Sequence, residues 1–296
     1  EVQYDIKDGE LVLEISCPWE HTILWEVPLM AMISELYFKL CDTHWEDYED
    51  LISIRIREKR HVLTGCKFAD FGTRRRRSHG VHRLVVNDLI KSPGFVGTSN
   101  MLLAYINNVK PIGTMAHEWI MGVSALEGLR HANRHALRIW SEIYKGSLGI
   151  ALTDTFGTDA FLADFDLYFA KLFDGVRHDS GDPIEFGEKI ITHYKHLNID
   201  PASKTIVFSD SLTPEQALLI DNHFKSRINV SFGIGTNFTN DFPGSPALNM
   251  VIKMDRCNNV PVVKLSDDEG KQVGDANALQ VANWTFGRRQ NDLNLV

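Results

Sequence analysis

Short apolar runs that each end in a polar, glycine-rich segment recur along the chain from about residue 61 onward. The eight runs are Lys67–Phe71, Phe95–Gly97, Pro111–Gly113, Gly149–Leu152, Gly175–Arg177, Thr205–Phe208, Asn229–Phe232 and Asn249–Lys253. Helical patterns follow them, and strands that alternate with helices form parallel sheets. Eight such units predict an α/β fold of the (β/α)8-barrel type, with an open doubly wound sheet as the alternative.

The first 60 residues have a different pattern. Leu11–Ile15 and Ile23–Val27 alternate in the manner of strands. Pro28 opens a helical pattern that continues to about Cys41, and a second helical stretch follows up to Arg60. We therefore expect three parts: residues 1–60 from a mixed α+β domain with connecting helices, residues 61–266 as the barrel, and residues 267–296 as a helical or loose tail.

Composition excludes several classes of function. The net charge of -8 argues against a general nucleic-acid binder, which needs a basic excess. No apolar run approaches the roughly 18 residues of a membrane span. The four cysteines have neither disulfide-scaffold nor zinc-site spacing, which favours reduced thiols and a cytoplasmic location.

The polar segments after the strands predict where the chemistry occurs. In a barrel, the residues directly after each strand line the carboxyl-terminal mouth. The segments are Gly72–Arg74, Gly97–Ser99, Gly113–His117, Thr153–Thr155, His178–Asp182, Ser209–Ser211 and Gly233–Asn237. They supply hydroxyls, carboxylates and glycine-rich backbone, so one polar site is expected at this mouth.

Four consecutive arginines, Arg74–Arg77, follow the first predicted strand of the barrel. Guanidinium groups bind carboxylates and phosphates bidentately and remain charged when partly desolvated. Cations at the start of a helix oppose its dipole, so a compensating anion is expected. A solvated, salt-bridged helix start is the alternative.

Gly233-Ile234-Gly235-Thr236 follows another strand and could offer backbone N–H groups to a phosphate. Barrels often place a phosphate after the seventh or eighth strand, although a plain tight turn is the alternative. Asp154 and Asp179 also follow strands and could hold Mg²⁺ or ribose hydroxyls. For these carboxylates, a simple helix cap is the alternative.

His117 is the histidine whose position is most informative, because it follows the turn at Gly113-Thr114. The neighbouring Glu118 could fix its tautomer and raise its basicity, although a structural histidine is the alternative. No segment matches a hydrolase nucleophile elbow, a zinc-binding H-E-x-x-H or a P-loop. The residues by themselves indicate a phosphate-handling barrel enzyme.

Four segments resemble motifs of the nicotinate phosphoribosyltransferases, in the family's order: Asp70–Arg76, Gly113–Trp119, Gly175–Pro183 and Gly233–Asn237. The second is similar to the bacterial branch. The resemblance implies an irregular (β/α)8-type barrel of the type II phosphoribosyltransferases beside a mixed N-terminal domain. It implies transfer of a phosphoribosyl group from phosphoribosyl pyrophosphate (PRPP) to nicotinate in NAD biosynthesis. Mg²⁺ and coupling to ATP through a phosphorylated histidine, which His117 matches, are implied as well.

The resemblance also implies roles for individual residues. Phe71 would stack on the pyridine, Arg177 and Thr114 would contact nicotinate, and Arg74 would assist with its carboxylate. The further substrate contacts would be Ser99, Asp179, Ser180, Gly181 and Asp210, with Gly233, Gly235 and Thr236 holding the 5-phosphate of PRPP and Asp154 and Asp179 as candidate Mg²⁺ ligands. Related nicotinamide enzymes carry an aspartate where this chain has Ser99, so the serine favours the acid as substrate.

The family is further expected to form homodimers with composite active sites. Its N-terminal segment contributes an aromatic side chain that stacks on the pyridine, and this chain is expected to lack that segment. Two alternatives remain open: a related phosphoribosyltransferase that acts on nicotinamide or another pyridine, and a catalytically incomplete barrel that binds a phosphorylated ligand.

Overall fold

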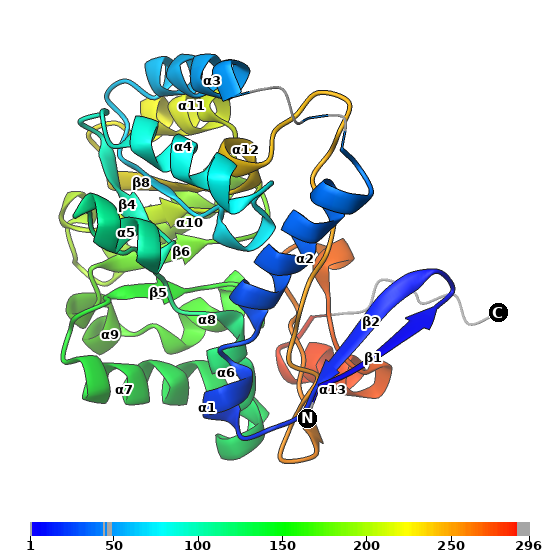
Figure 1. Ribbon diagram of the computed structural model, residues 1–296. Coiled ribbons are helices and arrows are strands. Elements are labelled where there is room, and N and C mark those ends of the chain that lie inside the picture. The colour runs from blue at the N-terminus through cyan, green and yellow to red at the C-terminus, as the bar shows by residue number, and fades with distance from the viewer. Residues whose placement is uncertain (1, 44, 46–48, 289–296) are drawn as a thin grey trace.

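The computed structural model describes residues 2–43, 45 and 49–288, and a parallel sheet lies at its centre (Figure 1). The strands are β3 (Phe68–Asp70), β4 (Phe95–Thr98), β5 (Ile150–Leu152), β6 (Gly175–His178), β7 (Thr205–Phe208) and β8 (Asn229–Ile234). Their order is β4-β3-β8-β7-β6-β5. Because β8 pairs with β3, the last strand returns to the first and the sheet curls into a barrel.

The barrel is irregular, with a seam between β4 and β5. The strand predicted at Pro111–Gly113 is reduced to a single bridge from Pro111 to Thr98, because proline has no N–H for a ladder. The strand predicted at Asn249–Lys253 is wrong, since this segment is irregular. The α/β barrel is confirmed, but the described residues form six of its eight expected strands.

Helices follow most of the barrel strands and cover the outside of the sheet (Figure 1). They are α4 (His79–Leu89), α5 (Met101–Asn107), α6 (His117–Glu127), α7 (Ala132–Tyr144), α8 (Thr158–Asp164), α9 (Leu167–Leu172), α10 (Pro183–His196), α11 (Pro214–Phe224) and α12 (Thr236–Thr239). Short 3-10 helices lie at Thr73–Arg75, Leu129–His131, Pro201–Ser203 and Glu269–Lys271. Asp182 caps α10 just before Pro183, and Thr213 forms a capping box with Gln216 at α11. These caps start the helices close to the strand ends and keep the loops at the mouth short.

Aromatic side chains fill the space between the sheet and the helices. Phe208 of β7 stacks on Phe232 of β8 at 6.0 Å and on Phe224 of α11 at 5.8 Å, measured between ring centroids. All three rings are fully buried. Such packing fixes the strands, and therefore the residues that follow them, in a rigid frame.

The N-terminal part consists of an antiparallel hairpin and three helices: β1 (Val2–Lys7), β2 (Glu10–Ile15), α1 (Trp19–Thr22), α2 (Glu26–Leu40) and α3 (Glu49–Val62). The strand predicted at Leu11–Ile15 is confirmed. The strand predicted at Ile23–Val27 is wrong: this segment has no paired strand, and the amide of Leu29 bonds to the Trp25 carbonyl in helical geometry. The two predicted helices correspond to α2 and α3.

The C-terminal part contains the short hairpin β9 (Arg256–Cys257) and β10 (Val260–Pro261), followed by α13 (Ala276–Thr285). The expected loose end at residues 289–296 lies outside the described residues. The boundaries at residues 60 and 266 stay predictions. We note that α3, before the first boundary, packs on α4 and α11 and buries Ile52 and Ile56 in the barrel's core.

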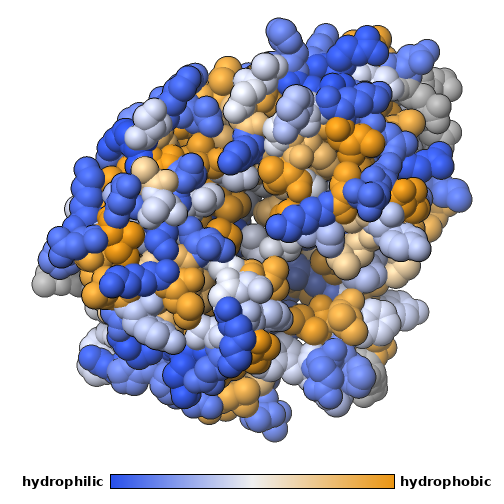
Figure 2. Space-filling view, turned by 90° about the vertical axis from the view of Figure 1, so that its left-hand side faces the viewer, coloured by the Kyte–Doolittle hydropathy of each residue, from blue (hydrophilic) through white to orange (hydrophobic). Residues whose placement is uncertain are grey.

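The surface is mixed in character. On the face shown in Figure 2, hydrophilic side chains are interspersed with apolar ones. Helix α5 leaves Met101, Leu102, Tyr105 and Ile106 exposed to solvent. Within the described part of the chain, no helix combines the length and the apolar character needed to cross a membrane. Cys17, Cys41, Cys66 and Cys257 are all free thiols.

Arg77 lies at the junction of α2 with the barrel and is fully buried. Its guanidinium carbon lies 3.6 Å from the centre of the Phe38 ring and 4.2 Å from that of Phe242. It also donates to the hydroxyl of Ser245 at 2.6 Å, and that hydroxyl donates to Asp42 at 2.5 Å. Burial lowers the pKa of Arg77 to about 10, so the side chain stays charged at neutral pH. Arg77 is thus a structural residue that joins α2 to the segment after α12.

We expect Arg77→Met to destabilise the fold by about 3 kcal/mol, because it removes a desolvated cation–π contact and hydrogen bonds from a charged donor. The midpoint of urea unfolding measures this change. Exposed Arg83→Met on α4 is the matched control and should leave the midpoint within about 0.5 kcal/mol of the wild type. Equal midpoints for the two variants would contradict the structural role of Arg77.

Candidate active site

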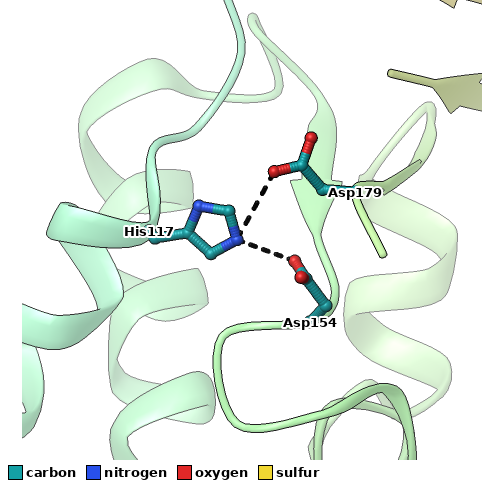
Figure 3. Close-up of side chains that lie close together, drawn as sticks. All are labelled: His117, Asp154 and Asp179. Carbon is teal, nitrogen blue, oxygen red and sulfur yellow. Dashed lines mark hydrogen bonds and ion pairs between the residues drawn. The ribbon is translucent and has the colours of Figure 1, made fainter. Parts of the chain in front are cut away.

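His117 and Asp154 form a buried pair at the mouth of the barrel. His117 is the first residue of α6, and Asp154 follows β5. The Nε2 atom of His117 lies 2.8 Å from Oδ1 of Asp154 and 3.6 Å from Oδ2 of Asp179 (Figure 3). Three residues that the sequence placed at separate strand ends therefore meet in one cluster.

The second oxygen of Asp154 has its own partners. Ser180 donates its hydroxyl to Oδ2 at 2.6 Å, and the ammonium of Lys264 lies 3.3 Å from the same oxygen. Burial alone would raise the pKa of Asp154, but the contacts with His117, Lys264 and Ser180 outweigh it and hold this pKa well below its usual range. Asp154 is therefore a carboxylate at neutral pH.

His117 is neutral at neutral pH, because burial lowers its pKa more strongly than Asp154 raises it. Next to an ionised Asp154, Nε2 carries the ring proton and donates it. The other nitrogen, Nδ1, makes no hydrogen bond to a described residue and points away from both carboxylates (Figure 3). Nδ1 thus keeps a free lone pair, which is the requirement for a nucleophile.

Arg177 and Asp179 lie on and after the next strand, β6. A guanidinium nitrogen of Arg177 lies 3.3 Å from Oδ2 of Asp179, and Arg177 also donates to the hydroxyl of Thr114. Ser209 donates its hydroxyl to Oδ1 of Asp179 at 2.8 Å. Burial would raise the pKa of Asp179, but Arg177 and His117 outweigh it and lower the pKa. Arg177 is a fixed cation whose guanidinium joins the two predicted substrate contacts Thr114 and Asp179.

His117, Asp154 and Asp179 have ligand atoms within 4.8 Å of one another, a spacing that can hold a cation. The two predicted Mg²⁺ ligands, Asp154 and Asp179, differ in how open their carboxylates are to a metal. Both oxygens of Asp154 already accept from donors, and its side chain is 1% exposed. The side chain of Asp179 is 24% exposed and faces the mouth. Asp179 therefore fits a metal bound to a substrate phosphate, whereas Asp154 fits the orientation of His117.

The arginine run has partners within the chain. Arg74 forms an ion pair with Glu26 of α2 at 2.8 Å, and Arg76 forms one with Glu35 at 3.5 Å. Glu26 and Glu35 therefore supply part of the compensating negative charge that was predicted beside the arginine run. Arg75 has no such partner among the described residues, and its Nε atom is buried without a hydrogen bond.

Phe71 lies where β3 meets β8. Its backbone amide donates to the carbonyl of Ile234 at 2.9 Å. A Cβ atom at Gly233 would lie 2.4 Å from the Phe71 ring, so only glycine fits beneath it. Gly233 is the fifth residue of β8 rather than part of the turn, and its lack of a side chain leaves room for the aromatic ring. The predicted phosphate contacts Gly235 and Thr236 follow the strand directly.

We expect Gly233→Ala to displace the Phe71 ring and raise the KM for the substrate that stacks on it about 10-fold, with a smaller change in kcat. Steady-state kinetics with nicotinate as the varied substrate measure this effect. Gly270→Ala is the control, because a Cβ at Gly270 meets no atom. An unchanged KM in a folded Gly233→Ala variant would separate Phe71 from the substrate site.

Ser99, Asp210 and Gly181 are the remaining predicted contacts. The hydroxyl of Ser99 lies 2.7 Å from that of Thr73, between β3 and β4, beside the buried pair of Asp70 and His82. Asp210 instead forms an ion pair with Lys271 at 2.7 Å. Gly181 accepts a hydrogen bond from His178 through its carbonyl at 3.0 Å and has a φ of 82°, which glycine adopts without strain. The contacts of Ser99, Asp210 and Gly181 with substrate stay predictions.

The prediction that Glu118 fixes the tautomer of His117 is wrong. Glu118 accepts a hydrogen bond from the indole of Trp19 at 2.8 Å. Asp154, not Glu118, is the carboxylate that contacts His117 and fixes its tautomer. Lys264 was missed altogether. A signal for it exists in the sequence: this lysine interrupts the apolar run Val262–Leu265, and a buried lysine requires a carboxylate partner.

A model of the nicotinate phosphoribosyltransferase (NAPRTase) family matches residues 66–290, a range that includes every strand of the barrel and the His117 cluster. The chain belongs to the nicotinate phosphoribosyltransferase family. It is 49% identical over 304 residues to nicotinate phosphoribosyltransferase of Methanosarcina acetivorans, which covers 97% of this chain and 75% of that relative.

Two other similarities agree with this family. The chain is 51% identical over 280 residues to nicotinate phosphoribosyltransferase 2 of Pseudomonas aeruginosa, covering 91% of this chain and 70% of that protein. The crystal structure of nicotinate phosphoribosyltransferase from Porphyromonas gingivalis superposes with a TM-score of 0.93 at 39% identity, covering 97% of this chain and 76% of the other. The chain thus spans about three-quarters of the length of these family members.

Proposed function

We propose that this chain transfers the phosphoribosyl group of PRPP to nicotinate, giving nicotinate mononucleotide and pyrophosphate in NAD salvage, and that ATP hydrolysis drives the reaction through a phosphorylated His117. The family of the chain supports the transfer. The observation that carries the ATP coupling is the geometry of His117. Its neutral ring is held through Nε2 by an ionised Asp154, and Nδ1 is left free.

The phosphorylation step follows from this arrangement. Nδ1 attacks the terminal phosphorus of ATP, the bond from that phosphorus to the bridging oxygen breaks, and ADP leaves with the electron pair. The positive charge that forms on the ring is stabilised by Asp154 through Nε2–H, as in other carboxylate–histidine pairs. Lys264 on the far oxygen keeps Asp154 in this orientation. Hydrolysis of the phosphohistidine then returns the free imidazole and inorganic phosphate.

The transfer step needs orientation and charge more than a base. The ring nitrogen of nicotinate attacks C1 of the PRPP ribose, the C1–O bond breaks, and pyrophosphate leaves with the electron pair. Nicotinate needs no deprotonation, so the site mainly has to hold the two substrates in line. Arg177, fixed by Asp179 and Thr114, supplies positive charge where negative charge develops or where the nicotinate carboxylate binds.

Magnesium belongs to this proposal as a companion of the substrate phosphates. Mg²⁺ would neutralise the charge on the leaving pyrophosphate and is usually held by one or two carboxylates together with phosphate oxygens. Asp179 is the carboxylate in this site that is open enough to meet it. Asp154 would act through His117.

Ser99 supports nicotinate over nicotinamide as the substrate. A serine hydroxyl places no negative charge beside the pyridine, whereas a carboxylate there would repel the acid. A homodimer with a composite site, and a cytoplasmic location in keeping with four free thiols, complete the proposal.

Incubation of the protein with γ-labelled ATP, PRPP and nicotinate tests the function directly. We expect an acid-labile phosphoprotein and nicotinate mononucleotide that depends on all three compounds for full rate. Nicotinamide in place of nicotinate is the control for substrate class and should give less than about one-hundredth of the product. A protein that takes up no label and makes no mononucleotide would overturn the proposal.

A further inference from the structure

Asp70 and His82 form a second buried aspartate–histidine pair, outside the His117 cluster. Asp70 is the last residue of β3, and His82 lies in the first turn of α4. Nε2 of His82 lies 2.6 Å from Oδ2 of Asp70, and both side chains are fully buried. No step of the proposed reaction uses either group. A buried ionisable pair adds little stability, because desolvation costs about as much as the contact returns. What distinguishes this pair from an apolar one is the set of groups that it holds in place.

The carboxylate of Asp70 accepts three hydrogen bonds. Oδ1 accepts from the amide of Gly72 at 2.8 Å, and Oδ2 accepts from the hydroxyl of Thr98 at 2.5 Å as well as from His82. Burial alone would raise the pKa of Asp70, but His82 and the other two donors outweigh it and lower this pKa. Asp70 is therefore ionised, and its donors link the ends of β3 and β4 to α4.

Asn100 fixes the orientation of the His82 ring. As the N-cap of α5, Asn100 accepts from the amide of Leu103 at 3.0 Å through Oδ1, so its amide nitrogen is the atom left to face His82. This nitrogen lies 3.5 Å from Nδ1 of His82, and an amide nitrogen can only donate. Nδ1 is thus the acceptor of the ring, and Nε2 is the nitrogen that donates to Asp70. Helix α5 is thereby tied to the same pair.

Phe71 lies inside a turn that Asp70 closes. The bond from the amide of Gly72 to Oδ1 of Asp70 spans two residues and forms an Asx turn with Phe71 at its centre. This turn fixes the backbone of Phe71 and therefore the direction of its ring, which lies against Gly233. The side chain of Asp70 thus sets where the ring stands.

Ser99 is held by the same aspartate. Its amide donates to the backbone carbonyl of Asp70 at 2.7 Å, and its hydroxyl lies 2.7 Å from that of Thr73. On one side, Thr98 donates to the Asp70 carboxylate, and its hydroxyl also accepts from the amide of Asn100 at 3.0 Å on the other side. Ser99 is therefore fixed by its own contacts and by both of its neighbours, in the same frame that fixes Phe71.

We propose that Asp70 and His82 are positioning residues for substrate selection, which hold Phe71 and Ser99 at a fixed separation that favours a pyridine carboxylate over the carboxamide. The inference rests on the proposed function, in which Phe71 stacks on the pyridine and Ser99 lies beside it. Asp70 and His82 do not touch the substrate, because both are fully buried. They act through the residues that they fix, and a binding site requires its groups to be held to within about 0.5 Å.

Titration calorimetry with nicotinate, together with steady-state kinetics on nicotinate and nicotinamide, tests this role. We expect His82→Phe to raise the Kd and the KM for nicotinate about 10-fold, because Asp70 loses a donor and the turn at Phe71 loosens. The ratio of kcat/KM for nicotinate to that for nicotinamide should fall by a similar factor, since Ser99 no longer has a fixed place. The KM values for PRPP and ATP should stay within about 2-fold of the wild type.

Two further variants test the same frame. In His82→Gln, the amide nitrogen of glutamine can occupy the place of Nε2 and donate to Asp70, so the Kd and the substrate preference should return to within about 3-fold of the wild type. Thr98→Val nearly preserves the shape of the side chain but removes the donor to Asp70, and it provides the same test should His82→Phe unfold.

His193→Phe on α10 is the matched control, because it removes a histidine hydrogen bond of 2.7 Å to the carbonyl of Phe165. It should lower the midpoint of circular dichroism melting and leave the Kd and the preference within about 2-fold. Folded His82→Phe and Thr98→Val with the wild-type Kd and preference overturn the inference, and so does a loss confined to kcat. A wild type that binds nicotinate more tightly than these variants but makes no mononucleotide overturns the proposed function alone.

Discussion

His117→Asn should abolish the acid-labile phosphoprotein and leave a rate of nicotinate mononucleotide formation that no longer responds to ATP. Asparagine is uncharged and polar, but its amide nitrogen has no lone pair available for attack on phosphorus. Coupling free energies of about 1–3 kcal/mol correspond to roughly 5- to 150-fold effects, so ATP should stimulate the wild type within this range and the variant not at all. Label retained after alkali, and initial rates with and without ATP, measure the two effects.

His196→Asn is the matched control for this variant, since His196 is exposed and is the last residue of α10, at the end of the helix away from Asp182. It should keep both the label and the ATP response. Because burial lowers the pKa of His117, the rate of labelling of the wild type should fall only at a lower pH than that at which an ordinary histidine becomes protonated. Label that persists in His117→Asn would place the phosphoryl group on another residue and refute the role of His117.

The barrel could be predicted from the chain because its signal is local. Six apolar runs, each followed by a helical pattern, became strands of one curled sheet that is open between β4 and β5. Two runs did not become strands of the sheet. Pro111 cannot donate to a ladder, and Asn249–Lys253 pairs with no described strand and leaves Val251 62% exposed.

The sequence predicted most residues of the His117 cluster, but not all the contacts between them. His117 begins α6, and successive residues of a helix point about 100° apart around its axis, so Glu118 turns away toward Trp19. Asp154 is distant in sequence and follows β5, yet its Oδ1 lies 2.8 Å from Nε2 of His117. Contacts of this kind depend on the order of strands in space, which periodicity alone does not reveal. Lys264 was missed for the same reason, because it reaches Asp154 from a segment after the last barrel strand.

Arg177→Ala should lower kcat/KM by about 30-fold or more, mainly through a higher KM for nicotinate or PRPP, because truncating a partly buried charged donor typically costs at least about 2 kcal/mol of binding. The side chain of Arg177 is only 11% exposed, and its loss leaves Asp179 beside His117 without its strongest partner. The pKa of Asp179 should therefore rise in the variant. Steady-state kinetics between pH 5 and 8 measure both the KM and its dependence on pH.

A merely structural Arg177 would give a different pattern. The double variant Arg177→Ala/Asp179→Asn removes both charges of the pair, so it should regain much of the stability that Arg177→Ala loses. If Arg177 binds substrate, the double variant still has the raised KM, because the cation is absent. Arg177→Lys retains the charge but not the fork that contacts Thr114 and Asp179 together, so its KM should lie between those of the wild type and Arg177→Ala. A KM that returns to the wild-type value in the double variant would show that Arg177 acts only by neutralising Asp179.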